Sequence, residues 1–105
     1  MATVNKNRAY HGTLTAATVD TVNLSRVYGR VQVLNRGGAN EIYWTTDGTA
    51  PTVGGDNCWV VPSQVGASDI RANSQAQSNT CVVKLISTGT PTYSVLGVDE
   101  TDIDL

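Results

Sequence analysis

The residues of this sequence with the most capacity for chemistry are a single histidine, two cysteines and a few carboxylates spread along the chain. A nucleophile–base pair requires the histidine to lie beside a serine or cysteine, with a third group orienting its ring. His11 falls in a polar N-terminal stretch, outside any predicted core or cleft. We therefore predict no catalytic residues and expect a protein that is not an enzyme.

The cysteines and aspartates also give no pattern typical of a metal site. Cys58 and Cys81 have no CxxC partner and no paired histidine. Both lie among apolar residues, which favours two buried thiols, with a disulfide as the alternative. Asp47 and Asp56 flank a glycine-containing loop, but the loop lacks the dense carboxylate spacing of calcium loops. We interpret Asp47 as a turn residue that bonds its own backbone, and we expect no metal and no cofactor.

Charge is distributed unevenly along the chain. Residues 1–36 contain five bases and one acid, whereas residues 99–105 contain four acids and no base. The two ends could therefore attract each other, within one chain or between neighbouring copies. The N-terminal stretch also supplies a candidate strip for docking to a protein partner, which consists of Lys6, Arg8, Tyr10 and His11.

The composition argues against two classes of partner. The net charge is −2 and the basic residues are spaced apart without interleaved aromatic residues, so we expect no binding to nucleic acid. No apolar run is long enough to span a bilayer, so we expect no membrane association. The sequence begins without a signal peptide, which predicts synthesis in a reducing cytoplasm.

Three aromatic residues form a second candidate binding group, this time for a sugar. Trp44 and Trp59 lie in predicted strands, and Tyr43 lies beside Trp44 on the opposite strand face. Aromatic side chains dominate burial in small β-proteins, so core packing is the favoured interpretation of this group.

The elements that must position these residues are predicted to be β-strands throughout. Valine and threonine each occur 14 times and phenylalanine is absent, a composition that favours strands over helices. Short alternating segments separated by glycine- and proline-containing turns predict a two-sheet β-sandwich. We expect an all-β, single-domain sandwich of jelly-roll or immunoglobulin-like type over residues 13–98. Residues 1–12 lack alternation and predict an extended N-terminal arm, and residues 99–105 predict an acidic C-terminal tail.

The segment from Ile42 to Thr52, IYWTTDGTAPT, combines a strand with a turn-forming loop. It resembles a motif of immunoglobulin-like accessory modules in bacterial chitobiase-type enzymes. It also resembles small, free-standing β-proteins encoded among the virion structural genes of tailed bacteriophages. The phage group is the more similar over residues 29–98, because three further segments agree with it: VQVLNR (31–36), CWVVP (58–62) and VKLISTGTPTYSV (83–95).

The phage resemblance implies a capsid decoration (cement) protein that binds the assembled shell and stabilises it. Its implied partners are the major capsid protein and further copies of itself, with a trimer favoured, and its implied location is the capsid surface of the virion. The alternatives are a carbohydrate-binding or adhesion module, with a glycan as the partner, and a minor tail protein.

Overall fold

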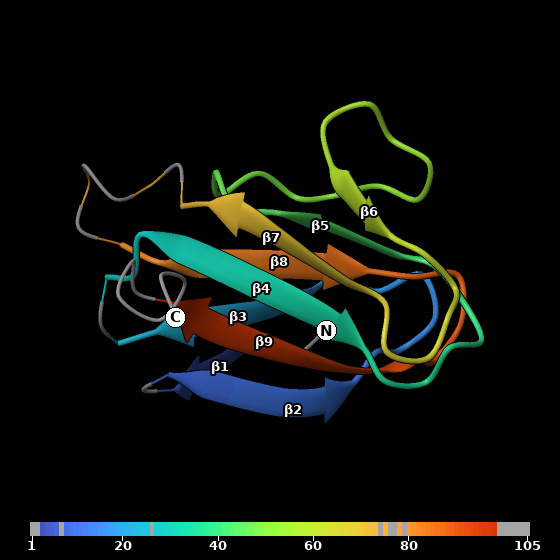
Figure 1. The fold of residues 1–105 in the computed structure, drawn as a ribbon. Coiled ribbons are helices and arrows are strands. Elements are labelled where there is room, and N and C mark those ends of the chain that lie inside the picture. Colours follow the sequence, from blue (N-terminus) through green and yellow to red (C-terminus); the bar gives the residue numbers. More distant parts are fainter. Residues whose placement is uncertain are drawn as a thin grey trace.

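The computed structural model describes residues 3–6, 8–25, 27–73, 75, 78 and 80–98, and its regular structure is β throughout this part of the chain. Two sheets pack face to face, with sheet B in front of sheet A in Figure 1. No helix with the length and apolar character needed to cross a bilayer occurs among the described residues. The strands are β1 (Thr3–Lys6), β2 (Ala9–Thr13), β3 (Asp20–Leu24), β4 (Arg30–Asn35), β5 (Ile42–Thr45), β6 (Trp59–Val61), β7 (Ser68–Ala72), β8 (Val82–Ile86) and β9 (Thr92–Val98).

The strand order identifies the topology. Sheet A has the order β1-β3-β8-β5-β6, and sheet B has the order β2-β9-β4-β7. The antiparallel pairs β2·β9, β3·β8, β4·β7 and β5·β6 form one long two-stranded ribbon that turns back on itself between β5 and β6. Successive pairs fall in opposite sheets, and the pairs β4·β9 and β5·β8 join them within each sheet. This winding is a jelly roll, or double-stranded β-helix, and so selects one of the two predicted sandwich types.

Alternation along the strands fills the core between the two sheets. In β4, Val31 and Val33 are fully buried, whereas Arg30, Gln32 and Leu34 face outward. The same period of two buries Ile42 and Trp44 in β5 and Tyr93 and Val95 in β9. The predicted all-β sandwich is therefore confirmed, and its core is aliphatic with a few large aromatic rings.

The N-terminal residues differ from the prediction of an extended arm. β1 pairs in parallel with β3, and β2 pairs with β9, so both strands belong to the sheets. Each strand is at a sheet edge and sends few apolar side chains inward, chiefly Val4 and Tyr10. A half-solvated edge strand needs little apolar alternation, so the sequence of residues 1–12 does not distinguish such strands from an extended arm. The predicted acidic tail, residues 99–105, lies outside the described residues.

The turn after β4 is organised by one buried side chain, that of Asn35. Asn35 donates from Nδ2 to the carbonyl oxygens of Asn40, at 2.8 Å, and Pro62, at 3.0 Å. Its Oδ1 accepts hydrogen bonds from the backbone N–H groups of Gly37 and Gly38. Gly38 has a φ of 72°, the left-handed conformation that favours glycine. A single amide therefore links this turn to the segment that follows β6.

Candidate binding surfaces

The four residues of the predicted docking strip do not share one surface. Tyr10 points into the sandwich, where its ring centroid lies 5.9 Å from that of Tyr93 in an edge-to-face arrangement. Lys6 is exposed and its Nζ lies 5.6 Å from the Tyr10 ring centroid. Arg8 is exposed, and its Nε donates to the Gly97 carbonyl oxygen at 3.3 Å. His11 is exposed on the outward side of β2, and a partner-binding role for these four residues remains a prediction.

His11 has a serine partner that the sequence did not reveal. Its Nδ1 lies 2.7 Å from Ser94 Oγ, across the β2·β9 pair. This is the contact with which a nucleophile–base dyad begins. Ser94, however, is only 2% exposed and lies in the middle of a paired strand, where a substrate cannot reach its hydroxyl. The contact therefore fixes the His11 ring on the sheet surface and supports no catalytic role.

The outward side of sheet B is a candidate binding surface, which we call the sheet B face. Strand register places Ile70, Gln32, Leu96 and Ala9 in one row across all four strands. Leu34, Leu96 and Val98 are partly exposed, and Ile70 is 44% exposed. No other described strand covers this face, which is turned toward the viewer in Figure 1.

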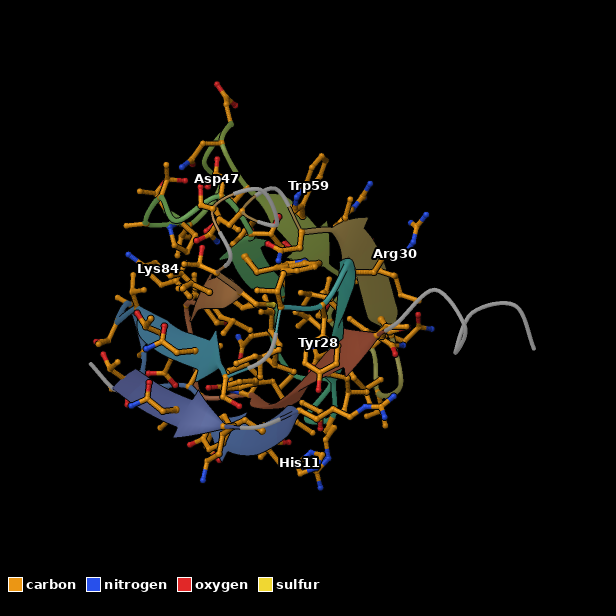
Figure 2. The ribbon with its side chains drawn as sticks, turned by 90° about the vertical axis from the view of Figure 1, so that its left-hand side faces the viewer. His11, Tyr28, Arg30, Asp47, Trp59 and Lys84 are labelled. Carbon is orange, nitrogen blue, oxygen red and sulfur yellow. The ribbon has the colours of Figure 1, made fainter. Side chains whose placement is uncertain are left out.

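The sheet B face contains cationic but no anionic side chains among the described residues. Arg30 is exposed at the start of β4 and pairs with Val98. The one carboxylate in these four strands, Asp69, is opposite the core residue Val33 and therefore points toward the interior side. Figure 2 shows Arg30 on the opposite side of the sandwich from Lys84, which projects from sheet A. The surface is therefore a mixture of aliphatic, polar amide and guanidinium groups.

A second exposed group lies at the rim where β6 and β7 meet. Trp59 is 44% exposed, and Arg71 Cζ lies 4.0 Å from its ring centroid. Arg71 also donates from Nε to Asp69 Oδ2 at 3.0 Å. Figure 2 places Trp59 far from His11. Trp59 lies opposite the fully buried Trp44 in the β5·β6 pair, so the two share one side of sheet A, whereas Tyr43 lies on the other side. The three aromatic residues therefore do not form one platform for a sugar.

The loop after β5 is held by its own side chains. Asp47 Oδ1 accepts hydrogen bonds from Thr49 N at 3.0 Å and from Thr49 Oγ1 at 2.6 Å. These hydrogen bonds lower the pKa of Asp47, because they stabilise its charged form. Asn57 Nδ2 donates to the Ala50 carbonyl oxygen at 3.2 Å. The geometry confirms Asp47 as a turn residue.

The interior contains buried polar groups, but among the described residues these groups do not form a cluster that could bind a ligand. Tyr93 donates its hydroxyl hydrogen to Asp20 Oδ2 at 3.0 Å, and both residues are buried. Cys58 and Cys81 are free thiols, of which Cys81 is buried and Cys58 partly buried. Within the described part of the chain, no three histidine, cysteine, aspartate or glutamate side chains are grouped closely enough to hold a metal ion.

Comparison with known proteins supports the fold. No family profile matches the chain, and no curated protein sequence matches it. A de novo designed double-stranded β-helix is 15% identical, with a TM-score of 0.56 over 88% of this chain and 100% of that chain. The crystal structure of PirA is 16% identical, with a TM-score of 0.51 over 89% and 95% of the two chains. The pre-peptidase C-terminal domain of a collagenase from Bacillus anthracis is 14% identical, with a TM-score of 0.45 over 91% and 93%. The designed protein agrees with the wound ribbon described above.

Proposed function

We propose that this chain is a structural protein of a tailed-phage virion that decorates the head, binds the assembled capsid and stabilises the shell. The sequence resemblance of residues 29–98 to small virion β-proteins supports this proposal. The structural observation that carries it is the sheet B face, a broad surface that no other described strand covers.

The chemistry of the sheet B face is suited to contact with another protein. Protein interfaces combine apolar contact with a polar rim, and arginine is enriched in them. The face offers the partly exposed Leu34, Leu96 and Ile70 beside Gln32 and Arg30. A sheet surface of this kind can pack against a capsid subunit without a cleft.

The proposed mechanism is binding alone. A protein that binds only the assembled shell stabilises it by mass action. Self-association, with a trimer favoured, would let one particle engage several capsid subunits, so each contact after the first gains effective concentration. Weak individual contacts are then sufficient for firm attachment.

The test is co-sedimentation of the purified chain with undecorated phage heads. The variant Leu96→Glu places a charge on the sheet B face, and we expect it to weaken binding at least about tenfold, which corresponds to about 1.4 kcal/mol. The matched control is Lys84→Glu, a charge change on the outer side of sheet A. Circular dichroism verifies that both variants fold.

Two results would contradict the head-decoration proposal. One is the absence of any association between the wild-type chain and heads. The other is binding to purified tails alone, which would favour the minor tail protein. If both variants lost the same affinity for heads, head binding would still hold, but the sheet B face would not be the surface responsible for it.

A carbohydrate-binding or adhesion module is the second candidate, and the exposed Trp59 favours it. Sugars stack on aromatic rings, and Arg71 already occupies one face of this indole. Soluble glycans added to the protein should quench tryptophan fluorescence if Trp59 binds sugar, because the other tryptophan, Trp44, is fully buried. Unchanged fluorescence in wild type and in Arg71→Ala would exclude Trp59 as a sugar platform.

A further inference from the structure

The large apolar side chains that are exposed among the described residues all come from one stretch of the chain. They are Val53, Trp59, Val60, Val65 and Ile70, each at least 40% exposed. This stretch contains β6, β7 and the loops beside them, and β6 and β7 are edge strands of sheets A and B that contact each other. Figure 2 places Trp59 of β6 at the opposite end of the sandwich from His11. Apolar side chains gathered in this way mark an interaction site.

β7 presents a backbone edge that can pair with another strand. Asn73 N donates to the Gly29 carbonyl oxygen at 2.9 Å, and this bond continues the register of the β4·β7 pair by one residue. Hydrogen-bonded pairs alternate along antiparallel strands, so Asp69 and Arg71 bond to β4, whereas the N–H and C=O groups of Ile70 point away from it. No other described strand lies on that side of β7, as Figure 1 shows. Such an edge is a template for pairing with another chain.

The side chains of β7 are complementary to those of a second β7. Asp69 and Arg71 both face the interior side of sheet B, where Arg71 stacks on Trp59. In an antiparallel pair of β7 strands centred on Ile70, each Asp69 would lie opposite Arg71 of the other copy. Opposite charges that face each other stabilise paired strands, and like charges destabilise them. Charged residues on an edge usually discourage pairing, but their alternating signs here favour this one orientation and register.

We propose that two copies of this chain form a dimer by antiparallel pairing of their β7 strands, with the two Ile70 residues facing each other across the two-fold axis. Their backbones exchange hydrogen bonds, and an Asp69–Arg71 contact forms on each side of the axis. The two four-stranded sheets then join into one continuous sheet, with both sheet B faces on the same side. This inference does not depend on the proposed function, and it gives a dimer where the phage resemblance implies a trimer.

Sedimentation velocity of the full chain measures the dimer fraction. Two five-residue strands make a small interface, so the dimer should form as protein concentration rises from about 1 µM to about 1 mM. Asp69→Arg and Arg71→Asp each place like charges opposite each other, and each should weaken dimerisation at least about tenfold. The control Lys84→Glu, on the outer side of sheet A, should dimerise as wild type does. Circular dichroism verifies that each variant folds.

A mixture of the two charge variants provides a rescue that misfolding cannot imitate. The chain with Asp69→Arg carries two bases in β7, and the chain with Arg71→Asp carries two acids. Opposite charges meet again when one copy of each pairs with the other. Native mass spectrometry of the equimolar mixture should therefore detect a dimer that contains one copy of each variant.

Cysteine substitutions in a Cys58→Ser chain test the register. Facing Ile70 residues have Cα atoms about 5.5 Å apart, so oxidised glutathione should link two Ile70→Cys chains by a disulfide. Gln32→Cys is the matched control, because Gln32 lies beside Ile70 but one strand further from the axis. Three strand spacings, about 14 Å, separate its two copies, which is too far for a disulfide.

Four results would overturn the proposal. They are a wild-type chain that stays monomeric at about 1 mM, a mixture of charge variants without the mixed dimer, equal linking at the two cysteine positions, and a trimer in solution. A trimer counts against it because pairing of one strand with its own copy closes at two subunits. None of these experiments contains a capsid, so their failure would leave the head-decoration proposal unaffected.

Discussion

At the scale of single residues, the core is specified by a few buried polar groups as well as by its apolar side chains. Asp20 is only 5% exposed, and its Oδ2 accepts a hydrogen bond from the Tyr93 hydroxyl. Burial, followed by the charge of Asp20, raises the pKa of Tyr93 well above its ordinary value. The pair joins β3 of sheet A to β9 of sheet B through the interior.

Replacing Tyr93 by phenylalanine should destabilise the protein. The substitution keeps the ring but leaves a buried carboxylate oxygen without its tyrosine donor, at a cost of about 1–3 kcal/mol. Urea unfolding at neutral pH measures the change. Tyr43→Phe is the matched control, because its hydroxyl bonds to Glu41 on the surface, and it should change stability by less than about 0.5 kcal/mol. Similar losses in the two variants would contradict a special role for the buried pair.

Stability should also decline at alkaline pH because of Tyr93. The pKa of Tyr93 is higher in the folded protein than in the unfolded chain, so the protonated hydroxyl stabilises the folded state. Its contribution to the free energy of unfolding is complete below the ordinary tyrosine pKa of 10.0 and decreases as the pH rises above that value. Tyr93→Phe lacks this dependence. The difference in unfolding free energy between wild type and variant should therefore narrow between about pH 8 and about pH 11. A constant difference would show that Tyr93 does not titrate on unfolding.

Individual residues also show what the sequence could and could not predict. Asp47 was predicted as a turn residue, because its chemistry is local and needs only Gly48 and Thr49 nearby. The contact of His11 with Ser94 was not predicted, because it depends on the register of β2 against β9. Strand register is set by the whole fold, and nothing near His11 in the sequence encodes it.

At the scale of elements, edge strands and interior strands differ in how strongly their sequences identify them. β9 lies between β2 and β4, and four of its seven residues are buried, including Tyr93 and Val95 in the core. β1 and β2 lie at sheet edges and were predicted as an arm, because only Val4 and Tyr10 mark their inward sides. Sequence periodicity therefore identifies a strand in proportion to how much of it is buried.

The two N-terminal strands should differ in importance for folding. A chain that starts at Arg8 lacks β1 and loses mainly the partial burial of Val4, so we expect it to fold with a lower melting temperature. A chain that starts at Leu14 also lacks Tyr10 and leaves β9 without an edge partner, so we expect no cooperative unfolding transition. Thermal unfolding followed by circular dichroism measures both. If the chain that starts at Leu14 unfolded cooperatively at nearly the wild-type melting temperature, residues 1–12 would be better described as an arm.

Close packing of Tyr28 against β9 explains why residue 97 is a glycine. A Cβ atom at Gly97 would overlap the ring of the buried Tyr28 at Cδ2, so alanine should overpack the core and cost about 1–3 kcal/mol. Gly29→Ala is the matched control, because its Cβ would meet no atom within 4 Å. Denaturant unfolding of both variants compares them. A larger loss at Gly29 than at Gly97 would show that Tyr28 moves aside without cost.

At the scale of the whole molecule, the ribbon topology determines which parts of the chain meet. β5 and β6 are close in sequence, whereas β2 and β9 come from opposite ends of the chain. The sequence predicted two packed sheets, because its apolar faces need cover on both sides. It left jelly-roll and immunoglobulin-like types open, because they differ only in which distant strands pair.

This topology predicts slow refolding. All-β domains dominated by distant pairings refold in milliseconds to seconds, because loop closure is costly before the contacts form. Stopped-flow tryptophan fluorescence measures the rate. Val61→Ala in the β5·β6 hairpin should slow refolding more, for the same loss of stability, than Val95→Ala in β9. Equal slowing would indicate that the distant pairs form as early as the hairpin.

The pairing of β2 with β9 also determines how the domain would respond to tension. Ala9 lies opposite Leu96 and Thr13 opposite Thr92, so β2 begins at the end of the sheet where β9 finishes. A force that pulls the two chain ends apart would first detach β1. It would then break the backbone hydrogen bonds between β2 and β9 one after another, starting at Ala9 and Leu96. A force spread over the flat side of the sheet would leave them unloaded. The molecule is therefore mechanically weak when stretched by its ends and robust when pressed or held by its broad side.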